Sequence, residues 1–528
     1  MSLIAFFDIE VDSSGKQLLD IGCGLSNGSH FHKNQPNEFR SFVEQSDFIC
    51  GHNILKHDLV YLQEYFDIPD WGSDKAIDTL PLSPLLYPQR PYHNLLKDDK
   101  LQTEELNNPL NDSLKAKSLF YDEVAAFQKL DDEFKEILYL LLSDQNAFSN
   151  FFKYLNYTAH TDKGDLQNII QKRFQGKICS ESDLGSFIQF SSVSLAYALA
   201  LLNCNDRFSI TPPWVLKNFP DVERLFFLMR NNPCVAGCDY CNLALDPVRA
   251  LKRHFGFSSF RTYGNEPLQR NAVNAAIRGE SMLAVFPTGG GKSITFQVPA
   301  LMSGENAKAL TVIISPLQSL MKDQVDNLEK KGITEAVTIN GLLDPVERGK
   351  AIERIEEGTA SLLYLSPESL RSVTIERLLL KRKIARFVID EAHCFSSWGQ
   401  DFRVDYLYIG DFIKDLQEKK GLDYTIPVSC FTATAKQKVI EDIKSYFREK
   451  LNLDLRVFRA NASRTNLHYS VYQKEGGPLP TEISFTKGSH FKAVGMIEEI
   501  SDHKVSGHDD LFDMDVVKFK ENVRFVQK

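Results

Sequence analysis

The sequence predicts an α/β protein built from several domains. Its 528 residues exceed what one hydrophobic core usually supports. After residue 280, short apolar runs that end in polar residues alternate with helix-compatible segments, which is the pattern of a parallel sheet with a site at its strand ends. The first of these runs leads directly into a glycine-rich turn at residues 286–293.

Composition narrows the classes of function. The hydrophobic content of 43% and the charged content of 25% are ordinary for a globular protein. The formal net charge of −9 provides no global attraction to nucleic acid, so any such binding depends on local basic patches. The sequence contains no apolar run of membrane length and no signal segment, and most of its nine cysteines are scattered. We therefore expect a cytoplasmic protein that does not bind membranes.

The first 125 residues open with an acidic strand. Residues 3–11 predict a strand that places Asp8 and Glu10 on one face, because side chains alternate along a strand. Further strands are expected near residues 18–22 and 29–32. The carboxylates of Asp58 and Asp112 follow later in the chain. Four converging carboxylates can hold two divalent ions, which activate a water molecule against a phosphodiester.

These segments resemble the DEDD family of 3′–5′ exonucleases, which has a ribonuclease-H-like fold. The most specific part is Gly-His-Asn-x4-Asp, which ends at Asp58. The resemblance implies that the four carboxylates bind Mg²⁺ or Mn²⁺ and act in catalysis. The family places a His or Tyr base before its last Asp, but Asn107 stands five residues before Asp112. His93 with Asp98 offers a second alignment, and His93 is either a substitute base or a surface histidine; we prefer the alignment on Asp112. Without a base, cleavage slows or stops while metal and strand binding remain.

Residues 126–250 predict a helical connector with a cysteine cluster. Apolar residues recur at helical spacing in stretches such as 134–142 and 187–202. Cys234, Cys238 and Cys241 lie within eight residues, and such thiolates bind Zn²⁺ or an iron–sulfur cluster. The candidates for a fourth ligand are Cys204, which we favour, Cys179 and His254. The spacing also resembles the cluster loop of radical-SAM enzymes, but predicted helices flank it, so we expect a structural clip between two domains.

The glycine-rich turn predicts a nucleotide site. It follows a predicted strand at residues 282–285 and precedes a helix, which is the order that a phosphate cradle requires. The backbone N–H groups of the glycines can face an anion, and a lysine and a serine follow for the phosphates and Mg²⁺. Phe286 stands where the general pattern has glycine. The residues expected to hold ATP and its Mg²⁺ (or Mn²⁺) are Thr288, Gly289, Gly290, Gly291, Lys292 and Ser293, joined by Asp390.

An acidic pair ends the predicted strand at residues 386–390. Asp390 is expected to hold the Mg²⁺ ion and Glu391 to polarise the attacking water, so together with Lys292 they form the expected catalytic set. His393, Thr432 and Thr434 end neighbouring segments from which they can sense the γ-phosphate.

Residues 250–470 resemble superfamily-two helicases, and within them the RecQ family. The most diagnostic part is the aromatic-rich loop at residues 390–403. The resemblance implies a RecA-like first motor lobe that couples ATP hydrolysis to contact with single-stranded DNA. Gln269 would read adenine, although its spacing from Arg261 is longer than usual. The residues that the resemblance assigns to DNA are Phe395, Trp398 and Phe402, which can stack on bases, and Arg403, which can meet a phosphate.

The last segment, residues 457–528, has no assigned role. Residues 459–471 resemble the crossover into the second RecQ motor lobe, but the remainder is too short for such a lobe and holds no final arginine motif. An arginine supplied across the nucleotide site raises the rate by roughly 10³–10⁵. We therefore expect a chain that binds nucleotide but hydrolyses it and unwinds DNA poorly, either as a truncated gene product or because a partner supplies the second lobe.

Four domains follow from these patterns: an exonuclease-like domain (1–125), a helical connector (126–250), a RecA-like helicase lobe (251–456) and a tail (457–528). The expected function is an ATP-dependent DNA helicase of RecQ type joined to a 3′–5′ exonuclease. It would act on single-stranded or junction DNA in repair and recombination. The alternative is a DNA- and nucleotide-binding protein that lacks effective catalysis, which Asn107 and the missing lobe favour.

Overall fold

The computed structural model describes residues 2–12, 17–93, 95, 108–204, 209–287, 289–341, 343–395, 403–433 and 436–460, with the backbone alone for 403–404. Beyond residue 460 it describes the backbone of six strands. The chain divides into two compact units, Met1–Ala460 and Asn461–Lys528. Among the described helices, none combines the length and the apolarity that crossing a bilayer requires.

The first unit begins with a five-stranded sheet. Its strands are β1 (Ile4–Val11), β2 (Leu18–Leu25), β3 (His30–His32), β4 (Phe48–Gly51) and β5 (Ala76–Asp78). The order is β3-β2-β1-β4-β5, and only β2 runs against the other strands. The expected strands near residues 3–11, 18–22 and 29–32 are therefore present. Three helices connect or follow these strands: α1 (Pro36–Val43), α2 (Asp58–Phe66) and α3 (Thr79–Leu86).

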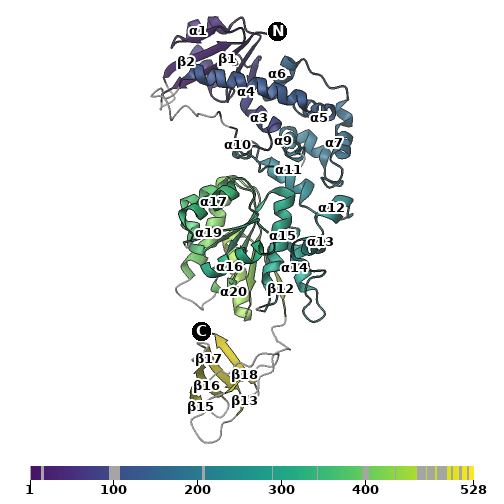
Figure 1. Cartoon of the computed structure of the whole chain (residues 1–528), viewed down its shortest axis with the longest axis vertical. Helices are drawn as coiled ribbons and strands as arrows, with labels where there is room; N and C mark the ends of the chain where they lie inside the picture. Colours follow the sequence, from purple (N-terminus) through teal and green to yellow (C-terminus); the bar gives the residue numbers. More distant parts are fainter. Residues whose placement is uncertain are drawn as a thin grey trace. The chain divides into compact units, whose positions relative to one another are not determined.

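Helix α4 (Pro109–Lys129) packs across β1 and β2 and runs past the expected domain boundary at residue 125 (Figure 1). Phe6 of β1 faces this helix, with its ring centroid 5.7 Å from that of Phe120. Gly22 of β2 permits the close approach, because a Cβ atom there would lie 1.9 Å from the backbone nitrogen of Leu110. The start of α4 is therefore held directly against the sheet.

Helices make up most of residues 132–255, as the periodicity predicts. They are α5 (Asp132–Leu142), α6 (Asn146–Leu155), η2 (Lys163–Asp165), α7 (Leu166–Arg173), α8 (Leu184–Phe190), α9 (Ser192–Leu202), α10 (Pro213–Asn218), α11 (Asp221–Arg230), α12 (Asp239–Ala244) and α13 (Pro247–Phe255). The apolar stretch 187–202 divides at Ser191 into α8 and α9. Helix α9 is buried at every residue from Ser194 to Leu202, because α3, α5 and α11 pack around it.

The second half of the first unit, which we call the parallel-sheet domain, contains seven parallel strands. They are β6 (Met282–Val285), β7 (Leu310–Ile314), β8 (Ala336–Ile339), β9 (Leu362–Leu365), β10 (Ile384–Ile389), β11 (Val428–Thr432) and β12 (Arg456–Arg459). Their order is β12-β6-β11-β10-β7-β9-β8. The parallel sheet expected from the apolar runs is confirmed, and β8 and β12 extend it at its two edges.

Both faces of this sheet are buried. On β6, Met282 and Ala284 belong to one core cluster and Leu283 and Val285 to another, because alternate side chains point to opposite faces. The first face packs against α14 (Leu268–Ile277), α15 (Lys292–Ala307) and α16 (Gln318–Glu329). The second packs against α17 (Pro345–Glu356), α18 (Val373–Leu380), α19 (Arg403–Lys420) and α20 (Gln437–Leu451). Short 3₁₀ turns η3 (Pro367–Arg371) and η4 (Ala392–Phe395) follow β9 and β10.

The second unit is described by its strands alone. A two-stranded sheet pairs β13 (Val471–Tyr472) with β14 (Glu482–Ile483). A four-stranded antiparallel meander contains β15 (Met496–Ile500), β16 (Lys504–Asp509), β17 (Met514–Phe519) and β18 (Asn522–Gln527). The described strands of this unit are thus antiparallel, unlike those of the parallel-sheet domain.

Candidate functional site

The glycine-rich turn lies between β6 and α15. Gly289 and Gly291 have φ angles of 72° and 83°, which favour glycine because a side chain is strained there. A Cβ atom at Gly289 would meet no heavy atom within 4 Å, so the turn opens to free space at that point. Helix α15 begins at Lys292 and directs the positive end of its dipole at the turn. Thr288 lies outside the described residues. The turn has the shape and polarity of an anion cradle.

A chain of polar contacts connects the turn to two neighbouring strand ends. Lys292 Nζ lies 3.3 Å from Glu391 Oε1, and Glu391 Oε2 lies 3.2 Å from His393 Nδ1. The same His393 nitrogen lies 3.3 Å from Thr432 Oγ1. The strands β6, β10 and β11 carry these residues to one edge because β11 pairs in parallel with both of the others. Residues that are far apart in the sequence are thus brought together.

Burial and charge act differently on the two members of the acidic pair. Burial raises the pKa of Asp390, and the adjacent charge of Glu391 raises it further. Burial also raises the pKa of Glu391, but its contact with His393 and the charge of Lys292 outweigh burial, and the net effect lowers that pKa. Glu391 has a φ of 48°, a conformation that is uncommon outside glycine and clusters at functional sites. An ionised Glu391 therefore lies beside Lys292.

Three side chains anchor the turn: Arg261 and Tyr263 from the segment that precedes α14, and Gln269 from the first turn of α14. Arg261, Tyr263 and Gln269 donate hydrogen bonds, in that order, to the carbonyl oxygens of residues 289, 290 and 291, at 2.6 Å for Arg261 Nη1 and 2.8 Å for Gln269 Nε2. Gln269 Oε1 also accepts a hydrogen bond from Arg261 N at 2.8 Å. Gln269 was expected to read adenine, but here its buried amide bonds to the backbone at both ends and positions the turn.

Tyr263 is a residue of this site that the sequence analysis did not identify. The long spacing between Arg261 and Gln269 accommodates a tight turn in which Tyr263 and Glu266 exchange backbone hydrogen bonds of 3.0 and 3.2 Å. This turn stacks the Tyr263 ring on Phe286, with centroids 4.9 Å apart and planes 23° from parallel. The two departures from the general patterns, the long spacing and Phe286, therefore contact each other. The extra spacing between Arg261 and Gln269 was the sequence feature from which Tyr263 could have been identified.

Phe395 lies in the core of the parallel-sheet domain. Its side chain is 9% exposed and packs against the rings of Tyr406, Tyr446 and Phe447, with centroid distances of 5.4, 4.5 and 5.3 Å. This corrects the expected base-stacking role of Phe395, because its ring is used for core packing. The other residues expected to contact DNA either lie outside the described residues or are described by their backbone alone: Trp398, Phe402 and Arg403.

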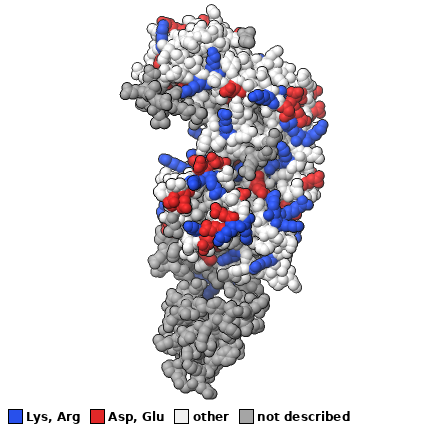
Figure 2. Space-filling model, viewed as in Figure 1, with Lys and Arg blue, Asp and Glu red and all other residues white. Residues whose placement is uncertain are grey.

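The surface of the first unit carries charge of both signs. On the face shown in Figure 2, basic and acidic side chains are interspersed. Together with the net charge of −9, this distribution makes any affinity for DNA depend on local contacts.

Three of the four predicted carboxylates converge at β1. Asp8 and Glu10 continue the strand face that meets α4, and Asp112 lies in the first turn of α4. One oxygen from each lies within 4.8 Å of the others. Asp58 begins α2, and its Oδ1 accepts a hydrogen bond from Ile9 N at 3.0 Å. Asp58 therefore adjoins this acidic cluster through the strand backbone rather than being a member of it.

Two basic side chains lie beside the acidic cluster. Lys115 Nζ is 3.5 Å from Asp112 Oδ1. His57 Nδ1 is 3.6 Å from Asp58 Oδ2, and its ring is half exposed. Interaction with Asp58 raises the pKa of His57, burial opposes this, and the charge of Glu10 adds to the rise. The sequence analysis did not single out His57, although it directly precedes one of the predicted carboxylates.

His93 is a core histidine rather than a surface one. Its ring is buried, and its Nδ1 lies 2.9 Å from Ser83 Oγ. Burial lowers the pKa of His93 to about 4, and burial does the same for the neighbouring His52. Asn107 and Asp98 lie outside the described residues.

The cysteine cluster contains Cys179 as its fourth member rather than Cys204. Its sulfur atoms, each within 4.8 Å of the others, belong to Cys179, Cys234, Cys238 and Cys241. Cys204 instead contacts the carbonyl oxygen of Ala200 at 3.8 Å, and His254 pairs with Glu305 at 3.3 Å. Cys179 follows α7, and its backbone nitrogen donates to Met229 O at the end of α11, which brings it to the cysteine loop. The favoured Cys204 is thus replaced by the second candidate of the sequence analysis.

Comparison with known families identifies the parallel-sheet domain. Residues 266–443 match the family model described as DEAD/DEAH box helicase. The match includes the glycine-rich turn, the acidic pair and Thr432, and residues 1–265 lie outside it.

The similar proteins found by sequence comparison are also helicases. ATP-dependent helicase SGS1 of Saccharomyces cerevisiae is 37% identical over 241 residues, which are 44% of this chain and 16% of that protein. ATP-dependent DNA helicase RecQ of Haemophilus influenzae is 35% identical over 227 residues, which are 43% of this chain and 33% of that protein. The aligned region thus spans a third or less of these relatives. The crystal structure of DUF1998 helicase MrfA bound to DNA is a weak likeness, with a TM-score of 0.34 and 19% identity over 42% of this chain and 30% of that chain.

Proposed function

We propose, from the DEAD/DEAH box helicase domain at residues 266–443 and its RecQ-type relatives, that this chain is an ATP-dependent DNA motor of RecQ type acting in DNA repair or recombination. The observation that carries the proposal is the contact of Lys292 with Glu391, continued through His393 to Thr432. These contacts join the turn that faces a phosphate to the strand ends that handle the ion and the water.

The residues present fit a nucleotide and its ion. The turn opens to free space at Gly289, where the phosphates would bind, and the ammonium of Lys292 is positioned to move from Glu391 to the outer phosphates. Ser293 and Asp390 offer the oxygen ligands that Mg²⁺ prefers, and the ion, when bound, neutralises phosphate charge. Glu391, which remains ionised at neutral pH, orients the attacking water.

DNA-stimulated release of phosphate from ATP tests the motor. The wild-type chain should release phosphate faster when single-stranded or junction DNA is added, and Lys292→Ala should abolish this release because the outer phosphates lose their cation. Lys438→Ala, which removes an exposed lysine of α20, is the matched control and should behave as wild type. Release that persists in Lys292→Ala would contradict the proposal.

We also propose that the acidic cluster is a metal-dependent nuclease site of DEDD type. Two features support it: the convergence of Asp8, Glu10 and Asp112, and a sheet order with β2 alone antiparallel, which suits a ribonuclease-H-like fold. The three carboxylates would hold Mg²⁺ or Mn²⁺, which activates a water molecule when bound. Asp58 positions the strand between the ligands, and the half-exposed His57, which contacts Asp58, is a group able to accept a proton.

Digestion of end-labelled single strands with Mn²⁺ tests this nuclease. Asp8→Asn should abolish the loss of label because a metal ligand is removed. His57→Gln should slow the loss and flatten its dependence on pH, since a titrating base, whose pKa is raised by its interaction with Asp58, is removed. Digestion by Asp8→Asn at the wild-type rate would identify a contaminant instead.

One contact favours a second candidate, in which the chain binds DNA and nucleotide without effective catalysis. The ammonium of Lys115, 3.5 Å from Asp112 Oδ1, competes with a metal ion for that carboxylate. Tight DNA binding with neither digestion nor phosphate release would support this candidate. Lys115→Gln should then raise the affinity for Mn²⁺, which isothermal titration measures.

One further component completes the proposal. The cysteine cluster holds a metal, either Zn²⁺ or an iron–sulfur cluster, because four thiols converge there.

A further inference from the structure

The four clustered cysteines are arranged as ligands rather than as disulfides. Cys179 Sγ and Cys238 Sγ are 3.7 Å apart, much farther than the roughly 2 Å of a disulfide bond, and all four thiols are free. Backbone N–H groups point at two of the sulfur atoms: Cys238 N lies 3.3 Å from Cys234 Sγ, and Cys234 N lies 3.5 Å from Cys241 Sγ. Such N–H groups stabilise thiolates, which are the metal-binding form of cysteine.

The spacing of the sulfur atoms distinguishes between the two metals. A single tetrahedral ion with bonds of about 2.3 Å places its thiolates about 3.8 Å apart. The Cys179–Cys238 distance of 3.7 Å matches that value, and all four sulfur atoms lie within 4.8 Å of one another. An iron–sulfur cluster inserts several atoms between its cysteines and therefore holds them farther apart. We propose that Cys179, Cys234, Cys238 and Cys241 bind one Zn²⁺ ion, and that this ion braces the helix that carries the nucleotide turn. This inference rests on the proposed nucleotide site and deepens it.

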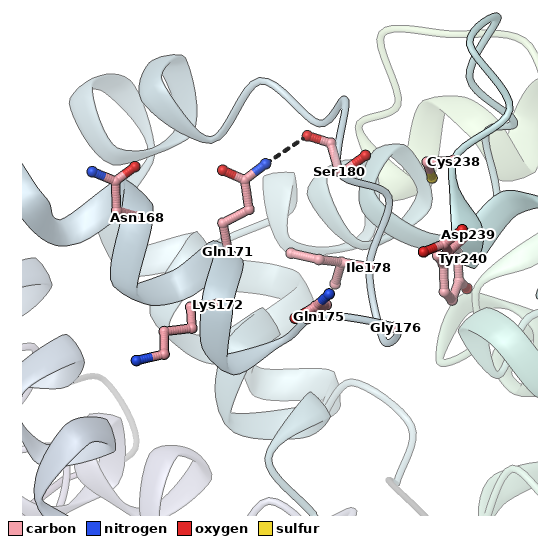
Figure 3. Close-up of a pocket in the computed structure, with 10 residues that line it drawn as sticks. All are labelled: Asn168, Gln171, Lys172, Gln175, Gly176, Ile178, Ser180, Cys238, Asp239 and Tyr240. Carbon is pink, nitrogen blue, oxygen red and sulfur yellow. Dashed lines mark hydrogen bonds between the residues drawn. The ribbon is translucent and has the colours of Figure 1, made fainter.

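A route for the metal lies beside the cluster. Cys238 lines a cavity of about 330 Å³ between α7 and the start of α12. In Figure 3, Asn168 and Gln171 of α7 lie on one side of this cavity and Cys238 and Tyr240 on the other. Gln171 Nε2 donates to Ser180 O at 2.8 Å, which ties the segment after Cys179 to α7. The cavity gives a chelator or a free ion access to the site without unfolding the domain.

Residues that flank the cysteine loop hold the far end of α15. Before the loop, Arg230 Nε donates to Asn306 O at 2.6 Å, and Asn231 Nδ2 donates to Ser303 Oγ at 3.1 Å. After the loop, Ala244 O accepts a hydrogen bond from Asn306 Nδ2 at 3.2 Å. The residues on both sides of the cysteine loop, which the metal would hold in place, are thus hydrogen-bonded to the last turn of α15.

Helix α15 connects these hydrogen bonds to the nucleotide site. It spans 16 residues, about 24 Å, from Lys292 at the turn to Ala307 at the end near the cysteine loop. The cluster also shares one apolar core with Phe260, which precedes Arg261, and with Val298 on α15. A metal that fixes the cysteine loop therefore fixes the orientation of Lys292 and the position of the Arg261 segment, and its loss should loosen both.

Metal content and nucleotide affinity of the full chain test the inference. Elemental analysis should find one zinc per chain and no iron in the wild type, with no visible absorbance band. Cys179→Ser should lose most of the zinc and bind a fluorescent ATP analogue several-fold more weakly. Cys204→Ser is the matched control, because that thiol lies outside the cluster, and it should keep both the zinc and the affinity.

Other results would each reject a different part of the inference. Iron with a visible band, or full zinc retention in Cys179→Ser, would reject the zinc site. Zinc loss with unchanged nucleotide affinity would reject the brace. A wild type that holds zinc but binds no nucleotide would instead reject the proposed motor. If Cys179→Ser does not fold, extraction of zinc from the folded wild type with a chelator, followed by measurement of affinity before and after zinc is restored, gives the same comparison.

Discussion

Tyr263→Phe isolates one hydrogen bond of the nucleotide turn. The substitution removes the hydroxyl that donates to Gly290 O and keeps the ring stacked on Phe286. Removing the donor to a buried carbonyl oxygen costs ~1–3 kcal/mol, which corresponds to a change of about 5- to 160-fold in an equilibrium constant. Because Gly290 is buried, its carbonyl oxygen has no water to replace the lost donor. The turn should leave its present conformation more often, and nucleotide affinity should fall by that factor.

Titration with a fluorescent ATP analogue measures this change directly. Tyr65→Phe, which removes an exposed hydroxyl far along the chain, is the control and should leave the affinity unchanged. Tyr263→Leu should weaken binding further, because it also removes an aromatic stack that contributes ~0.5–1.5 kcal/mol. A double-mutant cycle with Phe286→Leu should show that the two ring substitutions are not additive.

The hydroxyl should remain a donor over the whole working range of pH. Burial raises the pKa of Tyr263 to about 12, against an ordinary value near 10. Its stabilising effect is therefore complete below pH 10 and is lost only as the pH rises through about 12. If Tyr263→Phe binds the nucleotide analogue as tightly as the wild type at pH 7, the hydroxyl does not hold the turn and our reasoning is refuted.

Three more predictions concern burial and charge. Burial lowers the pKa values of His52 and His93 to about 4, so the stability that the neutral rings provide above pH 6.5 should be lost as the pH falls from 6.5 towards 4. Hydrogen exchange of β1–β5 should accelerate over that window. In a variant that carries both His52→Gln and His93→Gln the acceleration should be absent, which would confirm that the two histidines cause it. Phe395→Ala should cost about 3–5 kcal/mol of unfolding free energy and lower the thermal midpoint; an unchanged midpoint with weaker DNA binding would restore the base-stacking role. Glu391→Gln should slow phosphate release on the order of 100-fold while nucleotide affinity persists. If the affinity measured by equilibrium titration falls together with the rate of phosphate release, Glu391 serves nucleotide binding rather than water activation.

Local sequence patterns were sufficient to predict the strands, turn and helix that carry the nucleotide site. The expected strand at residues 282–285 is β6, and the turn and helix that follow it occur where the glycines and Lys292 predict them. The reason is that strand and helix periodicity and the φ freedom of glycine act over a few residues. The acidic pair after β10 and Thr432 at the end of β11 were located in the same way.

Long-range partners were less predictable. Cys179 displaced Cys204 because a backbone hydrogen bond to Met229 at the end of α11, not sequence spacing, brings its sulfur to the cluster. Phe395 lies in an aromatic-rich segment and looked like a DNA contact, yet α19 and α20 enclose its ring. Tyr263 gained its role only because the fold places the carbonyl oxygen of the distant Gly290 beside it.

The sequence by itself determined where a phosphate-binding turn, an acidic strand and a thiol-rich loop lie along this chain, because short-range backbone preferences and residue spacing encode each of them. Only the tertiary structure decided which side chains complete them: Cys179 at the sulfur cluster, Tyr263 under the glycine turn and Asp58 beside rather than within the acidic group. These choices depend on the packing of whole helices and sheets, whose free energy is a sum over many distant contacts, so no local pattern specifies them.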